Sequence, residues 1–346
     1  MMTLKQIWIR RGDGQWAVTD LIGLDLKGKK ADSDAFFEVQ NDLAVKQGMG
    51  TPPGTIKSVM GESIVPVIAK VHGEERFRCI GTGFFISCTG LLVTAGHVVM
   101  DPIERKYGGV TEVDDRSWTT NNMDLGVLVR KNPLFFGRGF DFYPIEWSAF
   151  LAEKIDEVMP FQKRSKLKLR VDVAICKVRS RPNGAAHQPL TIIQPGIKGT
   201  SLKIGANVRA LGYPCMPEMF GRAPNGTCQL SNNKNLEMYV SSGKLKDWVP
   251  DNLANPSLPA PGPCFTFDAK IPGGMSGGPI FDHEGIYVHG VVSMGSDNEA
   301  GTDAFSYGAM LGAALNIPIA MMNGATLSQL HAGHTEGMAI LKGGDL

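Results

Sequence analysis

The sequence predicts an all-β (mainly β) fold whose strands run antiparallel in sandwiches or barrels. From about residue 62 onward, short runs rich in Val, Ile, Phe and Tyr follow one another, each bounded by Gly, Pro, Asn or Asp. These residue types favour strands and turns respectively. The 346-residue chain also contains 42 glycines and 21 prolines, which suit many tight turns better than a helical bundle.

The strand-like runs can be followed in order along the chain. They are SIVPVIAKVHG, RFRCIGTGFFIS, GLLVTAG, LGVLVR, LKLRVDVAICKV, ANVRALGYP, NLEMYVSSG, CFTFDAK, GPIFD and IYVHGVVSM. One helix is expected late, over YGAMLGAALNIPIAMM at 307–322, although Gly and Pro interrupt its pattern.

Changes in composition divide the chain into three parts. Residues 1–55 are polar and rich in Lys and Asp, and they end in the linker-like cluster GMGTPPG, so they are interpreted as an N-terminal extension. Residues 56–320 hold the strand-rich domain, and residues 321–346 form a loosely held C-terminal tail. Within the domain, 101–166 mixes strand-like and helix-like segments such as EWSAFLAEKIDEVM, and it is interpreted as an insertion.

Charge and cysteine content narrow the function classes. The 35 Lys and Arg nearly balance the 34 Asp and Glu, so neither nucleic acid nor a membrane surface is a predicted partner. The N-terminus lacks the apolar core of a secretory signal and no run is long enough to span a membrane, so we expect a cytoplasmic protein. The six cysteines form no C-x-x-C pair, which argues against a metal site. Because no export signal is recognised, we expect all six to be reduced thiols. In an oxidising compartment, Cys79 with Cys88 or Cys215 with Cys228 are the alternative disulfide pairs.

The octapeptide PGGMSGGP at 272–279 sets Ser276 among four glycines, which indicates a sharply turning or closely approached backbone. The G-x-S-x-G pattern also occurs in α/β-hydrolases, where Asp and then His follow the serine; Asp303, then His331 or His334, would be the partners here. That fold needs a helix directly after the serine. The residues Gly-Gly-Pro-Ile-Phe predict a turn into a strand instead.

A serine nucleophile can instead take its base from an upstream histidine. His97 follows the apolar run LLVT and a small-residue turn, which places it at the end of a rigid element. Asp172 lies within the apolar run LKLRVDVAICKV, where a carboxylate is costly to bury unless it is paired. Asp124, in NNMDLGVLVR, is the competing candidate.

Four stretches together resemble the trypsin/chymotrypsin clan, and within it the bacterial branch that includes the HtrA-type (DegP-like) proteases. They are GTGFFIS…GLLVTAGHVV, DVAICKV, GANVRALGYP and DAKIPGGMSGGPIFD…IYVHGVVSMG. The resemblance covers about residues 62–318. It implies two antiparallel six-stranded β-barrels with a C-terminal helix and a triad in the cleft between the barrels. It makes His97 the general base, Asp172 the orienting carboxylate and Ser276 the nucleophile. The resemblance favours Asp172 over Asp124, because DVAICKV leads through a loop to LKIGANVRALGYP, the order of strands that the family shows after its catalytic Asp. The backbone N–H groups of Gly274 and Ser276 would form the oxyanion hole.

The same resemblance suggests how a substrate is held. Ser293, Met294 and Gly295 match the strand that pairs with substrate backbone, and Lys270 falls at the floor of the primary pocket. A Lys270 side chain pointing inward would favour acidic residues before the cut bond, whereas one pointing outward leaves a small apolar pocket. Met275 stands where digestive relatives carry an Asp, so activation by an ion pair to a new N-terminus is not expected.

The resulting hypothesis is a serine endopeptidase that cleaves polypeptide substrates without a metal or organic cofactor. An esterase with the same triad and a catalytically silent binding scaffold are the alternatives. Residues 1–55 are the candidate contact for a regulatory protein partner. Only 70 residues follow Ser276, so no PDZ module is expected.

Overall fold

The computed structural model describes residues 6–10, 16–20 and most of 62–341. Within the last range it leaves out 75–76, 105–109, 115–116, 121, 131–138, 160–161, 182–183, 194–201, 215–219, 223–227, 231–237, 250–261, 283–286, 296–304, 334–335, 337 and 339. Of the expected N-terminal extension, the structure describes an antiparallel pair, β1 (Gln6–Arg10) and β2 (Trp16–Asp20). The rest of that extension lies outside the described residues.

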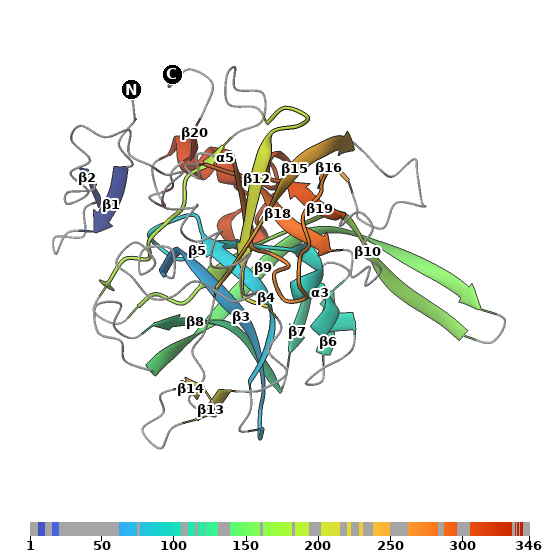
Figure 1. The fold of residues 1–346 in the computed structure, drawn as a ribbon. Helices are drawn as coiled ribbons and strands as arrows, with labels where there is room; N and C mark the ends of the chain where they lie inside the picture. Colours follow the sequence, from blue (N-terminus) through green and yellow to red (C-terminus); the bar gives the residue numbers. More distant parts are fainter. Residues whose placement is uncertain are drawn as a thin grey trace, which may run out of the picture.

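The first barrel is a closed ring of six antiparallel strands (Figure 1). Hydrogen bonding runs in the order β3, β4, β5, β10, β9, β8 and back to β3. The strands are β3 (Ile64–Val71), β4 (Phe77–Phe85), β5 (Leu91–Thr94), β8 (Met123–Arg130), β9 (Gly139–Met159) and β10 (Gln162–Val178).

The second barrel closes in the same way. Its ring runs β12, β15, β16, β19, β18, β17 and back to β12, again with antiparallel pairing throughout. The strands are β12 (Asn207–Gly212), β15 (Tyr239–Val249), β16 (Cys264–Phe267), β17 (Pro279–Asp282), β18 (Val288–Gly295) and β19 (Ser306–Met310). The expected fold of two six-stranded barrels is therefore confirmed.

Shorter elements surround the barrels. The strands are β6 (Val110–Asp114), β7 (Ser117–Thr120), β11 (Ile192–Ile193), β13 (Phe220–Arg222), β14 (Cys228–Leu230) and β20 (Ile340–Leu341). The helical pieces are α3 (Gly96–Glu104), α4 (Leu311–Ala314), the 3-10 turn η3 (Ala320–Met322) and α5 (Leu327–Ala332). No helix in the described ranges is long and apolar enough to cross a bilayer.

Alternating apolar residues fill the barrels. In the second barrel, Phe265 and Phe267 of β16 point into one apolar cluster together with Val208 and Ala210 of β12. Side chains two residues apart lie on the same face of a strand, so this spacing brings both pairs inward. Each fully buried large apolar side chain contributes about 1.5–3 kcal/mol relative to exposure. These contacts give the barrels the rigidity that a site built on their ends requires.

Two sequence expectations on secondary structure are wrong. The helix expected over 307–322 is largely absent, because β19 extends to Met310 to pair with β16 and β18, and only α4 and η3 are helical. The C-terminal helix is α5, which Thr326 begins with a capping box. The segment EWSAFLAEKIDEVM lies within strand β9 and not in a helix.

The range 101–166, interpreted from sequence as an insertion, needs correction as well. It contains β8 and most of β9, and both strands are needed to close the first barrel. Their pairing with β3 and β10 outweighs the mixed composition that suggested an insertion. The far halves of β9 and β10 continue as a long hairpin that projects from the molecule (Figure 1).

The C-terminal segment is held more firmly than its sequence predicts. The Glu336 carboxylate lies 3.2 Å from the Lys177 ammonium and also accepts a hydrogen bond from the Thr89 hydroxyl. Met338 bridges to Ser87, and β20 pairs with β11. These contacts attach the segment to the first barrel and, through β11, to the edge of the sheet that forms the second barrel.

Four cysteines, Cys79, Cys88, Cys176 and Cys264, are buried thiols, so the alternative Cys79–Cys88 disulfide is not formed. Cys215 and the side chain of Cys228 lie outside the described residues.

Candidate active site

His97 is presented by the end of a buried strand. All four residues of β5 are buried, and the chain turns through Ala95 and Gly96 into α3, whose first turn holds His97. A Cβ on Gly96 would lie 3.3 Å from a carboxylate oxygen of Asp172, so the turn comes close to this acid. The His97 side chain keeps 31% of its surface exposed, which leaves one side of the ring open.

Asp172 lies in an irregular stretch of β10, where the register with β9 shifts between Leu169 and Ala174. Such bulges re-aim side chains next to active sites. The carboxylate, only 3% exposed, accepts three hydrogen bonds. His97 donates two of them, from Nδ1 at 2.8 Å and from its backbone N–H at 2.8 Å, and the Ser293 hydroxyl donates the third at 2.5 Å.

These contacts set the charges of the site. Burial raises the pKa of Asp172, but the positive charge of His97 and the hydrogen bonds from His97 and Ser293 outweigh burial, so the pKa lies below its usual value. Burial lowers the pKa of His97, but the charge and hydrogen bond of Asp172 and the charge of Asp101 outweigh it, so the pKa is raised. At neutral pH, Asp172 is therefore an ionised acceptor.

The glycine run around Ser276 is needed for both turning and close approach. Gly274 and Gly277 have φ of +92° and +89°, a backbone region that side chains other than glycine rarely adopt. A Cβ on Gly277 would lie 2.0 Å from the carbonyl oxygen of Thr82, and one on Gly278 would lie 2.0 Å from that of Leu211. The loop is thus packed backbone to backbone against its neighbours.

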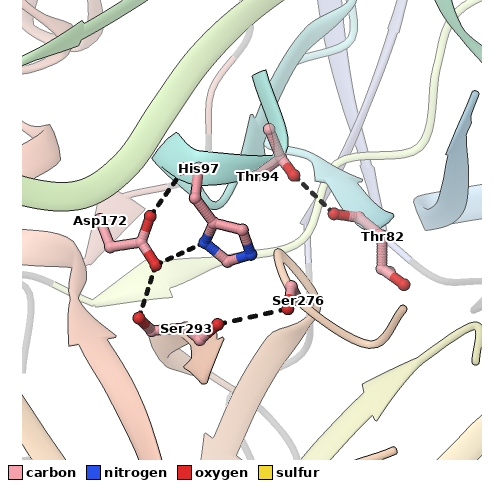
Figure 2. Close-up of polar contacts among 6 residues, drawn as sticks. All are labelled: Thr82, Thr94, His97, Asp172, Ser276 and Ser293. Atoms are coloured by element: carbon pink, nitrogen blue, oxygen red, sulfur yellow. Dashed lines mark hydrogen bonds and ion pairs between the residues drawn. The ribbon is translucent and has the colours of Figure 1, made fainter. Parts of the chain in front are cut away.

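Ser276 joins the other residues through Ser293. Its hydroxyl donates to the Ser293 carbonyl oxygen at 3.2 Å, and the Ser293 hydroxyl donates to Asp172, which holds His97 (Figure 2). Ser293 therefore contacts both sides of the site: its carbonyl accepts from Ser276 of the second barrel, and its hydroxyl donates to Asp172 of the first barrel. Sequence reasoning placed Ser293 only on a substrate-binding strand. Its bond to Asp172 is a further role that no local sequence signal marks.

The alternative acids and bases lie elsewhere. Asp124 is on β8, where its carboxylate pairs with the His72 ring nitrogen Nε2 at 3.0 Å, and both side chains are nearly half exposed. His331 is in the last turn of α5, while Asp303 and His334 lie outside the described residues. The barrel fold also removes the basis for an α/β-hydrolase arrangement.

The residues expected to bind substrate are accessible in part. Met294 of β18 is 41% exposed, whereas the backbone of Gly295 approaches Ile271 so closely that a Cβ would lie 2.4 Å from its carbonyl oxygen. The Lys270 side chain is exposed, and its carbonyl accepts a hydrogen bond from the Ser241 hydroxyl at 2.5 Å.

Sequence reasoning missed Thr82, a fully buried residue of β4. Its backbone N–H donates to the carbonyl oxygen of Ser276 at 2.7 Å, and its hydroxyl donates to that of Gly274 at 2.9 Å. A polar residue within the apolar run GTGFFIS was the available signal. No sequence pattern, however, links it to a loop 192 residues away.

Solved structures that are similar to this chain include Deg5, which shares 17% identity with it at a TM-score of 0.39, covering 72% of this chain and 86% of that one. The Rv3671c protease from M. tuberculosis in its active form shares 19% identity at a TM-score of 0.39, covering 81% and 87%. The serine endoprotease from Yersinia pestis shares 15% at a TM-score of 0.38, covering 76% and 65%. Comparison with curated proteins finds no match.

A comparison with protein families is more decisive. The model of the trypsin-like peptidase domain matches residues 81–291, which is more than half of the chain. The match begins in β4 of the first barrel and ends in β18 of the second, and it includes His97, Asp172 and Ser276. The chain therefore belongs to the family of trypsin-like peptidases.

Proposed function

We propose that the chain is a serine endopeptidase in which Ser276 is the nucleophile, His97 the general base and Asp172 the orienting carboxylate. Membership of the peptidase family implies a polypeptide substrate. The observation that carries the proposal is the pair of hydrogen bonds that Asp172 accepts from His97, one from Nδ1 and one from the backbone N–H, each at 2.8 Å.

The state of His97 follows from this contact. An ionised carboxylate can only accept hydrogen bonds, so the Nδ1 atom that faces it must carry the proton. In the neutral ring, Nε2 is then an acceptor and can take the proton of a serine hydroxyl. The buried Asp172 also stabilises the positive ring that forms when His97 accepts that proton.

Before substrate binds, the Ser276 hydroxyl donates to the carbonyl of Ser293 at 3.2 Å. A rotation about the Cα–Cβ bond redirects this hydroxyl toward His97. Hydrogen bonds between a catalytic nucleophile and its base are often long or poorly aligned in free enzymes, and they tighten in the substrate complex. We infer that the Ser276 hydroxyl exchanges its 3.2 Å bond to Ser293 for a bond to His97 when substrate binds.

The reaction then proceeds in two stages. His97 removes the Ser276 proton as Oγ attacks the scissile carbonyl, and the protonated ring donates that proton to the leaving amine, which leaves an acyl-enzyme. Water, deprotonated by His97, hydrolyses the acyl-enzyme and restores Ser276. The backbone N–H groups of Gly274 and Ser276 are the proposed donors to the oxyanion, each contributing about 3 kcal/mol to transition-state stabilisation.

The proposal is tested by hydrolysis of denatured casein and of a mixed peptide library. The wild type is expected to generate new peptide ends, Ser276→Ala none, and Ser328→Ala of helix α5 as many as the wild type. Undiminished cleavage by Ser276→Ala, or no cleavage of any substrate by the wild type, would contradict it.

A further inference from the structure

We propose that Thr82 is the positioning residue of the Ser276 loop: the first barrel, through this one side chain and its backbone, holds the loop of the second barrel in its catalytic shape. The inference rests on the proposed function for its effect on catalysis. Its structural half, the anchoring of the loop, can be measured without any activity.

Thr82 binds the loop at two carbonyl groups. Its N–H donates to the Ser276 carbonyl at 2.7 Å and its hydroxyl donates to the Gly274 carbonyl at 2.9 Å. These two carbonyls enclose the peptide unit that carries the Ser276 N–H. Fixing both of them orients the Ser276 N–H, one of the two groups proposed for the oxyanion hole, although Thr82 itself does not touch that N–H.

The direction of the hydroxyl bond is determined by its neighbours. The Thr82 oxygen Oγ1 accepts a hydrogen bond from the backbone N–H of Tyr213 at 2.8 Å, and a backbone N–H can only donate. The single hydroxyl proton of Thr82 is therefore available to the Gly274 carbonyl, which can only accept. The result is a short relay from Tyr213 through Thr82 to Gly274.

Thr82 is itself held in place. Its carbonyl accepts a hydrogen bond from the Thr94 hydroxyl at 2.7 Å, a contact within the first barrel (Figure 2). Glycines approach it from two directions. A Cβ on Gly277 would lie 2.0 Å from the Thr82 carbonyl oxygen, and one on Gly212 would lie 3.0 Å from its hydroxyl oxygen. With so little space around it, Thr82 imposes its position on the loop.

This anchor is made without a charged group. Met275, next to Ser276, is fully buried in the apolar cluster of the second barrel and has no group for an ion pair. The neutral hydrogen bonds from Thr82 connect the loop to the first barrel, and bonds between Gly277, Gly278 and Val292 connect it to the second. They need no cleaved N-terminus, so the loop is held in the intact chain.

The test compares variants of Thr82 with a control. Thr82→Val keeps the shape of the side chain and removes the hydroxyl, Thr82→Ser restores the hydroxyl, and Thr82→Ala covers the case in which the valine variant does not fold. Ser87→Ala is the matched control, since it removes another fully buried hydroxyl of the first barrel, one that accepts from the Leu91 N–H and bonds to Thr89 rather than to the loop. Two readouts are used: amide hydrogen exchange of peptides covering 272–279, and kcat and KM on a cleaved peptide.

We expect exchange within 272–279 to be at least ~10-fold faster in Thr82→Val and Thr82→Ala than in the wild type and Ser87→Ala. We expect kcat to fall about 10- to 100-fold with KM within about 2-fold, because a small misplacement of catalytic groups costs that much. Thr82→Ser should recover kcat to within about 3-fold of the wild type, since it retains the donor.

Wild-type exchange in both hydroxyl-free variants would overturn the inference. So would an equal loss in Ser87→Ala, which would indicate general damage to the first barrel. A wild type without peptidase activity would contradict the proposed function, and the exchange comparison would still decide whether Thr82 anchors the loop.

Discussion

Replacing Asp172 with Asn is the change that bears most directly on the geometry of His97. The carboxylate uses both oxygens as acceptors: Oδ1 for the His97 backbone N–H, and Oδ2 for the His97 ring and the Ser293 hydroxyl. Asparagine has nearly the same shape but offers one oxygen and one NH2 group. The NH2 group of asparagine must therefore face either the His97 backbone N–H or the His97 ring and the Ser293 hydroxyl, all of which are donors to the carboxylate.

The cost depends on which way the amide turns. If its NH2 faces the ring, it donates to Nδ1 and forces the ring proton onto Nε2, so that His97 can no longer accept the proton of Ser276. If the oxygen faces the ring, the NH2 group opposes the His97 backbone N–H, and the positive ring loses its buried counter-charge. We expect kcat to fall about 10³- to 10⁴-fold, which corresponds to about 4–5.5 kcal/mol in activation free energy.

The pH dependence gives an independent signature. His97 must be neutral to act as a base, and its raised pKa places the acid limb of the wild-type rate above the ordinary value of 6.5. The Asp172→Asn substitution would remove the charge that raises this pKa and leave the burial that lowers it. The acid limb should therefore move to lower pH while the plateau falls.

The same shifts affect stability. The lowered pKa of Asp172 stabilises the fold above its unfolded value of 3.8, and this contribution is lost as pH falls through the folded pKa. The raised pKa of His97 stabilises the fold below 6.5, and that contribution is lost as pH rises through its folded pKa. The pair should therefore stabilise the wild type most between about pH 4 and pH 6.5.

The assay is the rate of labelling by a fluorophosphonate probe between pH 5 and pH 9, for the wild type, Asp172→Asn and Asp124→Asn. The Asp124 variant is the control, because that carboxylate pairs with the half-exposed His72. Equal rates in the wild type and Asp172→Asn, or an equal loss in Asp124→Asn, would refute the assignment of Asp172.

Three further predictions concern the framework of the site. Gly277→Ala should destabilise the fold by about 3 kcal/mol or more, measured by urea denaturation, because φ is +89° and the new Cβ would meet the Thr82 carbonyl oxygen at 2.0 Å; a wild-type midpoint would contradict this. Glu336→Gln should lower the free energy of unfolding by about 1–3 kcal/mol, since it leaves the mostly buried Lys177 without its charge partner, and an unchanged thermal midpoint would show that the C-terminal segment is not held by this pair. Cys176, whose pKa burial raises to about 12, should resist iodoacetamide at pH 8 until the protein unfolds, as followed by peptide mass mapping.

Much of the fold could be predicted because its signals are local. Alternating apolar runs such as CFTF, bounded by turn residues, identify strands from sequence alone. The prediction of a helix over 307–322 was wrong because the pairing of β19 with β16 and β18 outweighed the local sequence pattern. The insertion expected over 101–166 failed for the same reason, since closure of the first barrel recruits β8 and β9 over long distances in sequence.

The candidate site likewise contains residues that the local sequence marks and one residue that it does not. His97 and Ser276 stand in small-residue contexts that mark a functional turn, and Asp172 stands out as a carboxylate in an apolar strand. Asp124 has a similar local context, and the structure separates the two acids by pairing Asp172 with His97 and Asp124 with His72. The role of Thr82 could not be predicted, because it depends on contact between β4 and a loop that is distant in sequence.

The most direct test of the central claim is to treat the folded protein with diisopropyl fluorophosphate and locate the adduct by intact mass and peptide mapping. We expect one adduct, on Ser276, which is absent in Ser276→Ala and in His97→Ala. An unmodified wild type, or an adduct on another residue that persists in Ser276→Ala, would contradict it.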